Sequence, residues 1–373
     1  MGHNFASGET RARASAEPRP RSRGRLSWLA GLLALMLVAA ACSSGEPTEV
    51  EEAAERRSAD GREIIRFAFA PDPVWDYMKD TGVLHEWQEE HNLRIVTSES
   101  WSEFDYFANG HGDIVSMATH ELPLLEEESG IKVTAFGRYN HDRTSLMRRA
   151  EDNFNTIADI PQDANVCVGS AVSTTILWSV IANQLHDIDF RVGEGDYELS
   201  VHDYFEMPDL LESGECTVAA TIPEAAVPEL RTGDFEIMYD GRPPWQVYAD
   251  EVCRCEHRGM MSNLFVAREE WFEQHPDQAA AFLELWERGI ELWNENRDEI
   301  IRLYPAHFAV ETEEDTEWVI DYMSGDDDFF VDSVYLDEAW VEEETGLYDY
   351  MRQSGWMTQD TPIPRFEILP PPS

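Results

Sequence analysis

Apolar residues recur along this chain in two alternating patterns. Short continuous runs bounded by turn residues predict buried strands, and longer stretches with apolar positions three or four apart predict helices. Such alternation is typical of an α/β protein built on a mostly parallel sheet. The predicted strands of the first part are residues 63–71, 94–100, 112–119 and 132–140, and the predicted helices are residues 75–92 and 121–130.

The same alternation starts again at residue 156, which predicts a second α/β unit. A helical turn leads into an apolar run that ends at Ser170. The segments after it are predicted as helix 176–185, strand 197–202, helix 205–214, and a strand with a helix start over 216–230. Residues 277–304 then form a long helix with one apolar face at helical spacing: Phe282, Leu285, Trp286, Gly289, Leu292, Trp293 and Ile300.

The segment "GSAVSTT", residues 169–175, places small hydroxyl residues where a strand passes into a helix. Ligands of open α/β sheets bind beyond the carboxyl ends of strands. Backbone N–H groups and hydroxyls at this helix start are therefore expected to face a ligand, the alternative being an ordinary helix cap. A helix start stabilises a nearby anion by only about 0.3–1 kcal/mol, so other groups must supply selectivity.

The amino-terminal region has the pattern of an export signal. Six arginines between residues 11 and 25 precede an apolar stretch of 16 residues, Leu26 to Ala41, which is shorter than the roughly 20 that span a bilayer. "VAAAC" resembles the lipobox of bacterial lipoproteins, and this resemblance implies that Cys42 becomes the lipidated first residue; the alternative is cleavage at or before Ala41 with Cys42 unmodified. Residues 42–61 are polar and are predicted to be a flexible tether.

Charge excludes one class of partner. Without residues 1–41, which carry six arginines and two glutamates, the chain has 22 basic and 72 acidic residues and a formal net charge of −50. Nucleic-acid binding requires a basic surface, so nucleic acid is not expected as a partner. The acids are scattered through every segment, which fits a solvated surface suited to a salty habitat as well as a cation-binding surface.

Four cysteines remain beyond Cys42, and export permits their oxidation. Cys167 and Cys216 both lie in apolar runs, where two buried thiols and a disulfide are equally compatible with the pattern. Cys253, Cys255 and His257 stand at C-x-C-x-H spacing, which could serve a metal or a redox pair. No fourth ligand is evident nearby, and a pair in a surface loop is the alternative.

Four segments in order resemble those of bacterial solute-binding proteins of ABC importers, in the branch that binds taurine, other sulfonates, nitrate or thiamine-precursor pyrimidines. They are "FAFAPDPVW", "NGHGDIVSMATHE", "ADIPQDANVCVGSAVST" and "LLESGECTVAATIPEAAV", and the resemblance covers about Ile64 to Phe308. The chain departs from the family at "PQDAN", at "TVAA" and at Glu224-Ala225, where the family has Lys-Gly-Lys, a second Asp-Ala and Glu-Pro. Ligand identity therefore does not carry over.

The resemblance implies a type II periplasmic-binding-protein fold: two lobes, each a mixed, mostly parallel sheet flanked by helices, that close on a small molecule. Lobe 1 is expected at 62–138 and 242–360, lobe 2 at 139–241, a Pro-rich tail at 361–373, and the crossings near 136–143 and 238–242. The expected cleft residues are Trp75, Trp101, Glu103, His120, Glu121, Tyr139, Asn140, Arg143, Ser170, Ser173, Thr174 and Glu224.

Several of these residues have a plainer interpretation. Trp75 and Trp101 would also fit a half-buried core, His120 a capped surface position, and Arg143 a structural salt bridge.

Two functions remain open. The first is an exported, lipid-anchored, monomeric binding protein without enzymatic activity, cofactor or metal, which delivers a small organic or oxyanion solute to an ABC permease. The second is a metal-dependent enzyme of pyrimidine synthesis, because the resembling superfamily includes such enzymes. No Ser/His/Asp order, HExxH or P-loop is visible in the chain, and stoichiometric iron or zinc lost on replacing Cys253 and Cys255 would favour the enzyme.

Overall fold

The computed structural model describes residues 60–256, 260–324 and 330–372. The expected export signal, Cys42, most of the predicted tether and His257 lie outside these residues. Within the described part of the chain, no helix is long and apolar enough to cross a membrane.

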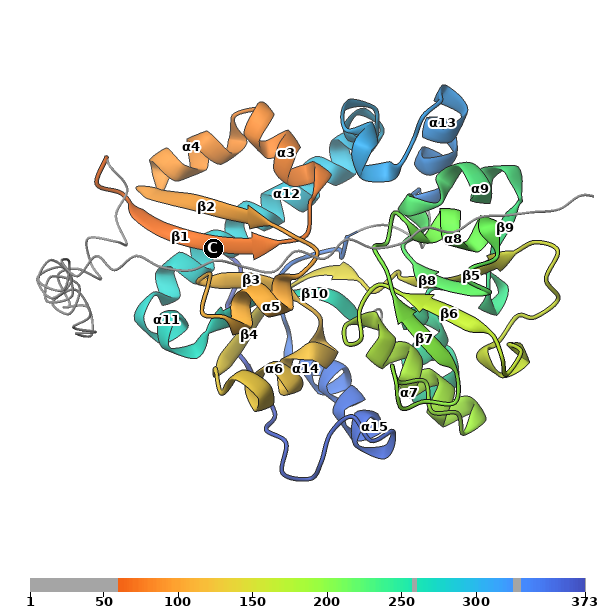
Figure 1. Cartoon of the computed structure of the whole chain (residues 1–373). Helices are drawn as coiled ribbons and strands as arrows, with labels where there is room; N and C mark the ends of the chain where they lie inside the picture. The colour runs from red at the N-terminus through yellow and green to blue at the C-terminus, as the bar shows by residue number, and fades with distance from the viewer. Residues whose placement is uncertain (1–59, 257–259, 325–329, 373) are drawn as a thin grey trace, which may run out of the picture. The chain divides into compact units, whose positions relative to one another are not determined.

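The first sheet has six strands in the order β11-β4-β10-β3-β1-β2 (Figure 1). β1 is parallel to β2 and β3, whereas β10 is antiparallel to β3 and β4. The predicted strands of the first part are confirmed. The strands are β1 (Glu63–Phe69), β2 (Leu93–Glu99), β3 (Ile114–Met117), β4 (Val133–His141), β10 (Met261–Arg268) and β11 (Arg365–Phe366).

The helix predicted over residues 75–92 is two helices. α3 (Pro73–Asp80) begins at Asp72, whose side chain accepts hydrogen bonds from Val74 N and Trp75 N. α4 (Val83–Glu90) follows Gly82, whose φ of 84° is left-handed and interrupts the helix. The other helices around this sheet are α5 (Glu103–Ala108), α6 (Leu122–Ser129), α11 (Glu269–Gln274), α12 (Pro276–Leu303), α13 (Glu313–Tyr322) and α14 (Glu338–Thr345).

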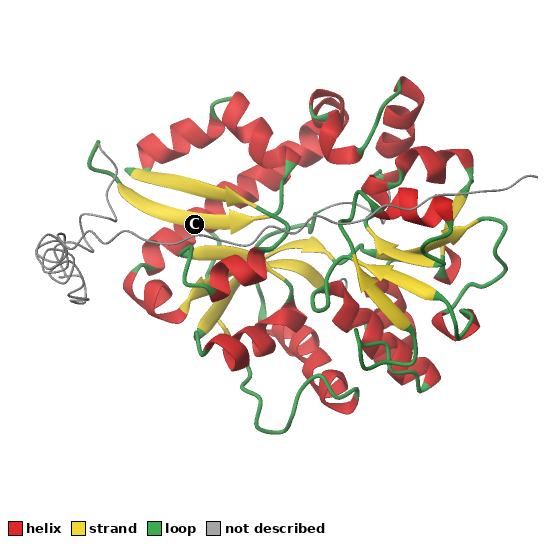
Figure 2. Ribbon diagram, in the orientation of Figure 1, coloured by secondary structure: helices red, strands yellow, loops and turns green. Residues whose placement is uncertain are grey.

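The second sheet has five strands in the order β7-β6-β8-β5-β9, and Figure 2 shows its helices and strands together. β6 is parallel to β7 and β8, and β5 is antiparallel to β8 and β9. The strands are β5 (Ser145–Arg149), β6 (Asn165–Val168), β7 (Glu198–Val201), β8 (Val218–Thr221) and β9 (Phe235–Ile237). The helices are α7 (Thr174–His186), α8 (Met207–Ser213), α9 (Val227–Thr232), α10 (Pro244–Val247) and α15 (Leu347–Gln353).

The chain returns to the first sheet later than the expected crossing at 238–242. Val247 and Tyr248 bury their side chains in the core formed by α7, so the segment 244–256 stays with the second sheet. α15 packs on α7 through the same core, which includes Tyr348 and Met351. Residues 244–256 and α15, which were expected in lobe 1, therefore pack with the second sheet. The expected Pro-rich tail, 361–373, contains the strand β11, which pairs with β4 of the first sheet.

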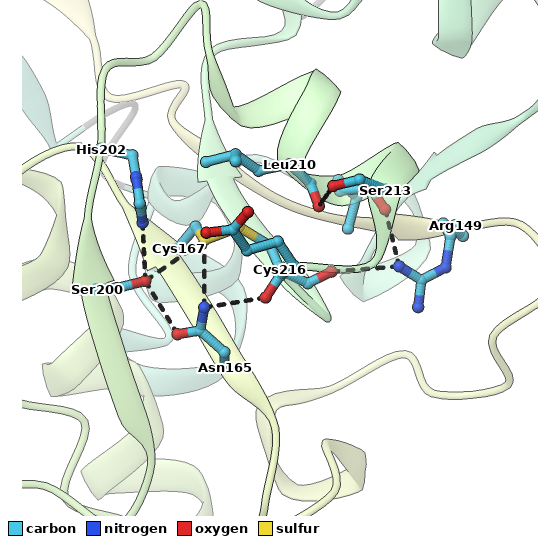
Figure 3. Close-up of a disulfide and its surroundings, with 10 residues drawn as sticks. Arg149, Asn165, Cys167, Ser200, His202, Leu210, Ser213 and Cys216 are labelled. Atoms are coloured by element: carbon cyan, nitrogen blue, oxygen red, sulfur yellow. Dashed lines mark hydrogen bonds between the residues drawn. A yellow bond between two sulfur atoms is a disulfide. The ribbon is translucent and has the colours of Figure 1, made fainter. Parts of the chain in front are cut away.

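Two disulfides join the four cysteines, which resolves the pairing that the sequence left open. Cys167 of β6 is bonded to Cys216, and Cys253 is bonded to Cys255. The first bond is fully buried against α8 and α9, and Figure 3 shows Ser200 and Asn165 beside it. It joins β6 to the segment that enters β8, the two strands whose ends lead to the site described next.

Candidate functional site

A cavity of about 390 Å³ lies between the two sheets, and loops from both form its wall. The parallel strands β1, β2 and β3 end at one edge of the first sheet, where their following loops gather. The loops after β6, β7 and β8 gather likewise at one edge of the second sheet. Parallel strand ends are where α/β sheets bind ligands, and here the two sets of ends supply opposite walls.

Seven residues predicted from the sequence line this cavity: Trp101, Glu103, Glu121, Arg143, Ser170, Ser173 and Thr174. Trp101 and Glu103 follow β2, Glu121 follows β3, and Arg143 lies in the crossing from β4 to β5. A second cavity of about 260 Å³ adjoins the first and shares Trp101, Arg143 and Ile222 with it.

The structure places Trp75 and Tyr139 in the core of the first sheet. Trp75 is 1% exposed, and its ring stacks on Trp286 of α12 with the centroids 5.7 Å apart. Tyr139 donates a hydrogen bond to the buried carboxylate of Asp72, the cap of α3. Helix α3 begins immediately after β1, and its phase turns Trp75 toward the sheet, away from the cavity wall.

The other three predicted residues lie behind or beside the cavity. His120 is fully buried, its Nε2 lies 3.9 Å from Asp142 Oδ2, and burial lowers its pKa to about 3, so the ring is neutral at pH 7. Asn140 is buried and accepts a hydrogen bond from Asn263 Nδ2. Glu224 pairs with Arg143 Nε at 2.5 Å and lines the second cavity.

The hydroxyl residues of 169–175 are partly used to hold their own loop. Ser170 Oγ accepts from Val172 N, and Thr175 Oγ1 donates to Ser170 O. Thr174 Oγ1 donates to Asp142 Oδ1, which ties the start of α7 to the segment between β4 and β5. Ser173 has φ 50° and ψ −141°, a backbone conformation that costs a residue other than glycine of the order of 1–3 kcal/mol. The segment therefore supplies a rigid wall as well as polar groups.

Aromatic residues of the two sheets meet at the cavity. Tyr204, in the loop after β7, lines the wall, and its ring centroid lies 5.6 Å from that of Trp101, edge to face. The Tyr204 ring lies directly over Gly169, where a Cβ would be 2.2 Å from two ring carbons. Only glycine permits this approach, which gives Gly169 of the predicted loop a specific role.

Sequence reasoning did not single out several lining residues, which include Ser116, Thr144, Tyr204 and Asn263. Tyr204 follows a predicted strand directly, a signal that could have found it. Ser116 lies inside a strand with four consecutive buried residues, so its sequence pattern carries no such signal.

Three carboxyl groups at or behind the cavity have raised pKa values. Burial, together with the neighbouring charge of Glu121, raises the pKa of Glu103 to about 8. Burial raises the pKa of Glu121 to about 7, with Asp142 adding to the effect, and burial raises the pKa of Asp142 to about 7. A positive charge placed beside any of these carboxyl groups would stabilise its ionised form and lower its pKa.

Comparison with known proteins identifies the fold. No protein-family model and no curated protein sequence matches the chain. Among solved structures, the alkanesulfonate-binding protein SsuA from Xanthomonas axonopodis pv. citri, bound to MOPS, is 11% identical with a TM-score of 0.60, over 78% of this chain and 93% of that one. The aliphatic sulphonate-binding protein SsuA from Escherichia coli is also 11% identical with a TM-score of 0.60, over 80% and 90%.

The periplasmic nitrate-binding protein NrtA from Synechocystis PCC 6803 is 12% identical with a TM-score of 0.53, over 80% of this chain and 83% of that one. The chain thus has the periplasmic-binding-protein fold that its sequence resemblance implied, with two mixed sheets flanked by helices.

Proposed function

We propose that this chain is the exported, lipid-anchored solute-binding component of an ABC importer, and that it works as a monomer without catalysing a reaction. The observation that carries the proposal is the cavity whose walls come from both sheets. A volume of about 390 Å³ lies within the usual range for small-molecule sites. The family resemblance implies a sulfonate, nitrate or a pyrimidine as the solute.

Capture would occur by closure of one sheet unit on the other about the crossings. The two crossing segments lie side by side, because Asp142 N donates to Met260 O at 2.8 Å. Away from them, Trp101 contacts Tyr204, and Arg231 of α9 pairs with Asp315 of α13 at 2.6 Å. These contacts would break on opening, and a bound solute would favour the closed form through groups that it touches on both sides.

The test is a thermal-shift screen of sulfonates, nitrate, pyrimidines and amines on the mature protein. A ligand at 100 times its Kd raises the free energy of unfolding by about 2.7 kcal/mol, and X-ray scattering should show a smaller radius of gyration with it.

Trp101→Ala and Gly169→Ala, one on each wall, should each weaken binding of the solute found by about tenfold or more. The first removes a ring from the wall, and the second displaces the Tyr204 ring. Trp101 is 38% exposed, so its replacement should hardly move the melting temperature of the empty protein. Gly169→Ala should lower that temperature, because the Tyr204 ring must shift to make room for the new Cβ. Normal binding by both variants, or an unchanged radius of gyration, would show that the cavity is not the solute site.

The anchor has its own prediction. Cys42→Ala should release the full-length protein from membranes into the soluble exported fraction, because acyl chains on Cys42 contribute about 0.8 kcal/mol per buried methylene. The measurement is fractionation after a salt wash, with Cys42→Ser as a second variant that also lacks the thiol. A variant that stays with the membrane would exclude lipidation at this cysteine.

A further inference from the structure

The cavity wall is acidic. Three acidic residues line it, Glu103, Asp105 and Glu121, and Arg143 is the sole basic residue among the described residues of the wall. The positive charge of Arg143 is already balanced by Glu224, whose carboxylate is 1% exposed. The net charge of the wall is therefore negative, and it would repel an anionic solute.

Among the described residues, the groups that act on Glu103 and Glu121 are backbone N–H groups, the Ser173 side chain and other carboxyl groups, not basic side chains. Glu121 Oε2 accepts from Ala118 N at 2.9 Å, and the groups that influence Glu103 are backbone N–H groups and the charge of Glu121. Two neighbouring carboxyl groups in a shielded site repel each other when both are ionised, and a counter-charge relieves this repulsion more fully than hydrogen bonds alone. The described residues place no such counter-charge beside Glu103 and Glu121.

Further groups on the wall can accept hydrogen bonds, although a serine hydroxyl can also donate one. Ser116 Oγ lines the cavity, is 1% exposed as a residue, and has no hydrogen-bond partner among the described residues. Asn263 donates one amide N–H to Asn140, and its carbonyl oxygen can accept a hydrogen bond from a ligand. These acceptors suit a solute that carries N–H donors.

From this wall we infer that the solute is a small organic cation, an amine, amidine or guanidine, whose charged nitrogen binds Glu103 and Glu121 and whose body lies against Trp101 and Tyr204. The inference rests on the proposed function and changes its solute class, because it excludes sulfonates and nitrate. Aromatic faces also attract a cationic group, which adds to the preference.

Benzamidine, benzamide and benzoate test which ligand charge the cavity prefers. They have nearly the same planar shape and carry charges of +1, 0 and −1. We expect titration calorimetry at pH 8.5 to show benzamidine binding at least about tenfold tighter than benzamide, and benzoate weakest. Glu103→Gln with Glu121→Gln should weaken benzamidine binding about tenfold and benzamide binding much less, because only benzamidine loses an attraction between charges. The control is Glu86→Gln with Glu90→Gln on α4, which removes the same charge from exposed positions.

The pH dependence gives an independent readout. Benzamidine stays protonated between pH 6 and 9, whereas Glu103 and Glu121 lose their protons within this range, so its binding should tighten as pH rises and should release protons near pH 7. The Gln variant should lose this dependence. The other titratable or charged groups around the pair include Asp105, His120, Tyr139, Asp142, Arg143, Tyr204 and Glu224.

The outcomes separate the inference from the function on which it rests. Benzoate or a sulfonate binding as tightly as benzamidine, with compaction, would overturn the cation inference and leave solute capture standing. Equal binding of all three compounds, or no binding of benzamidine, would overturn the inference as well. Absence of any compacting solute in the broad screen would overturn both.

Discussion

Trp75→Ala is expected to lower the free energy of unfolding by about 3–5 kcal/mol, the range for truncation of a large buried aromatic side chain. The ring is stacked on Trp286 and meets Phe69 edge to face at 5.5 Å, so its loss leaves a void that these neighbours cannot fill. Urea unfolding followed by circular dichroism measures the change. Binding of a solute by the folded variant should stay close to that of the wild type, because Trp75 does not reach the cavity wall.

Trp75→Phe is the matched control and should cost much less, since a six-membered ring remains and the indole N–H, which has no hydrogen-bond partner among the described residues, is removed. Trp101→Ala is the opposite case: Trp101 is 38% exposed, and its loss should affect binding far more than stability. A Trp75→Ala protein that is as stable as the wild type but fails to bind would place Trp75 in the site after all.

Removal of the buried disulfide by Cys167→Ala with Cys216→Ala is expected to cost about 4 kcal/mol in free energy of unfolding. The bond joins residues 49 apart in sequence, and the loop-entropy relation gives this value for a loop of that length. Chemical unfolding of the variant and the wild type under oxidising conditions measures the difference.

Cys253→Ala with Cys255→Ala is the control, because a bond between residues only two apart constrains the unfolded chain much less. The first variant should still bind solute at a temperature where it is folded, since neither cysteine lines the cavity. A loss below about 1 kcal/mol would mean that the unfolded chain gains little freedom when the bond is removed.

The sequence by itself determined those features that depend on residues near one another in the chain. Continuous apolar runs mark β1 to β4 and β6, and apolar positions at helical spacing mark α7, because a buried strand or helix needs apolar side chains whatever lies opposite. The apolar face of α12 is confirmed at every position from Phe282 to Ile300 that the spacing indicated. The loop after β6 could be placed at a strand end, and so at a cavity wall, from the order of elements alone.

Tertiary structure alone decided which of two similar tryptophans belongs to the core. Both follow a strand of the first sheet, but Asp72 starts α3 at Pro73 and turns Trp75 inward, whereas Trp101 precedes α5 and contacts Tyr204. The pairing of Cys167 with Cys216 and the gathering of Glu103, Glu121 and Asn263 are also tertiary facts. Each joins residues tens to more than a hundred positions apart, and local propensity carries no information about such distances, because the packing of whole elements sets them.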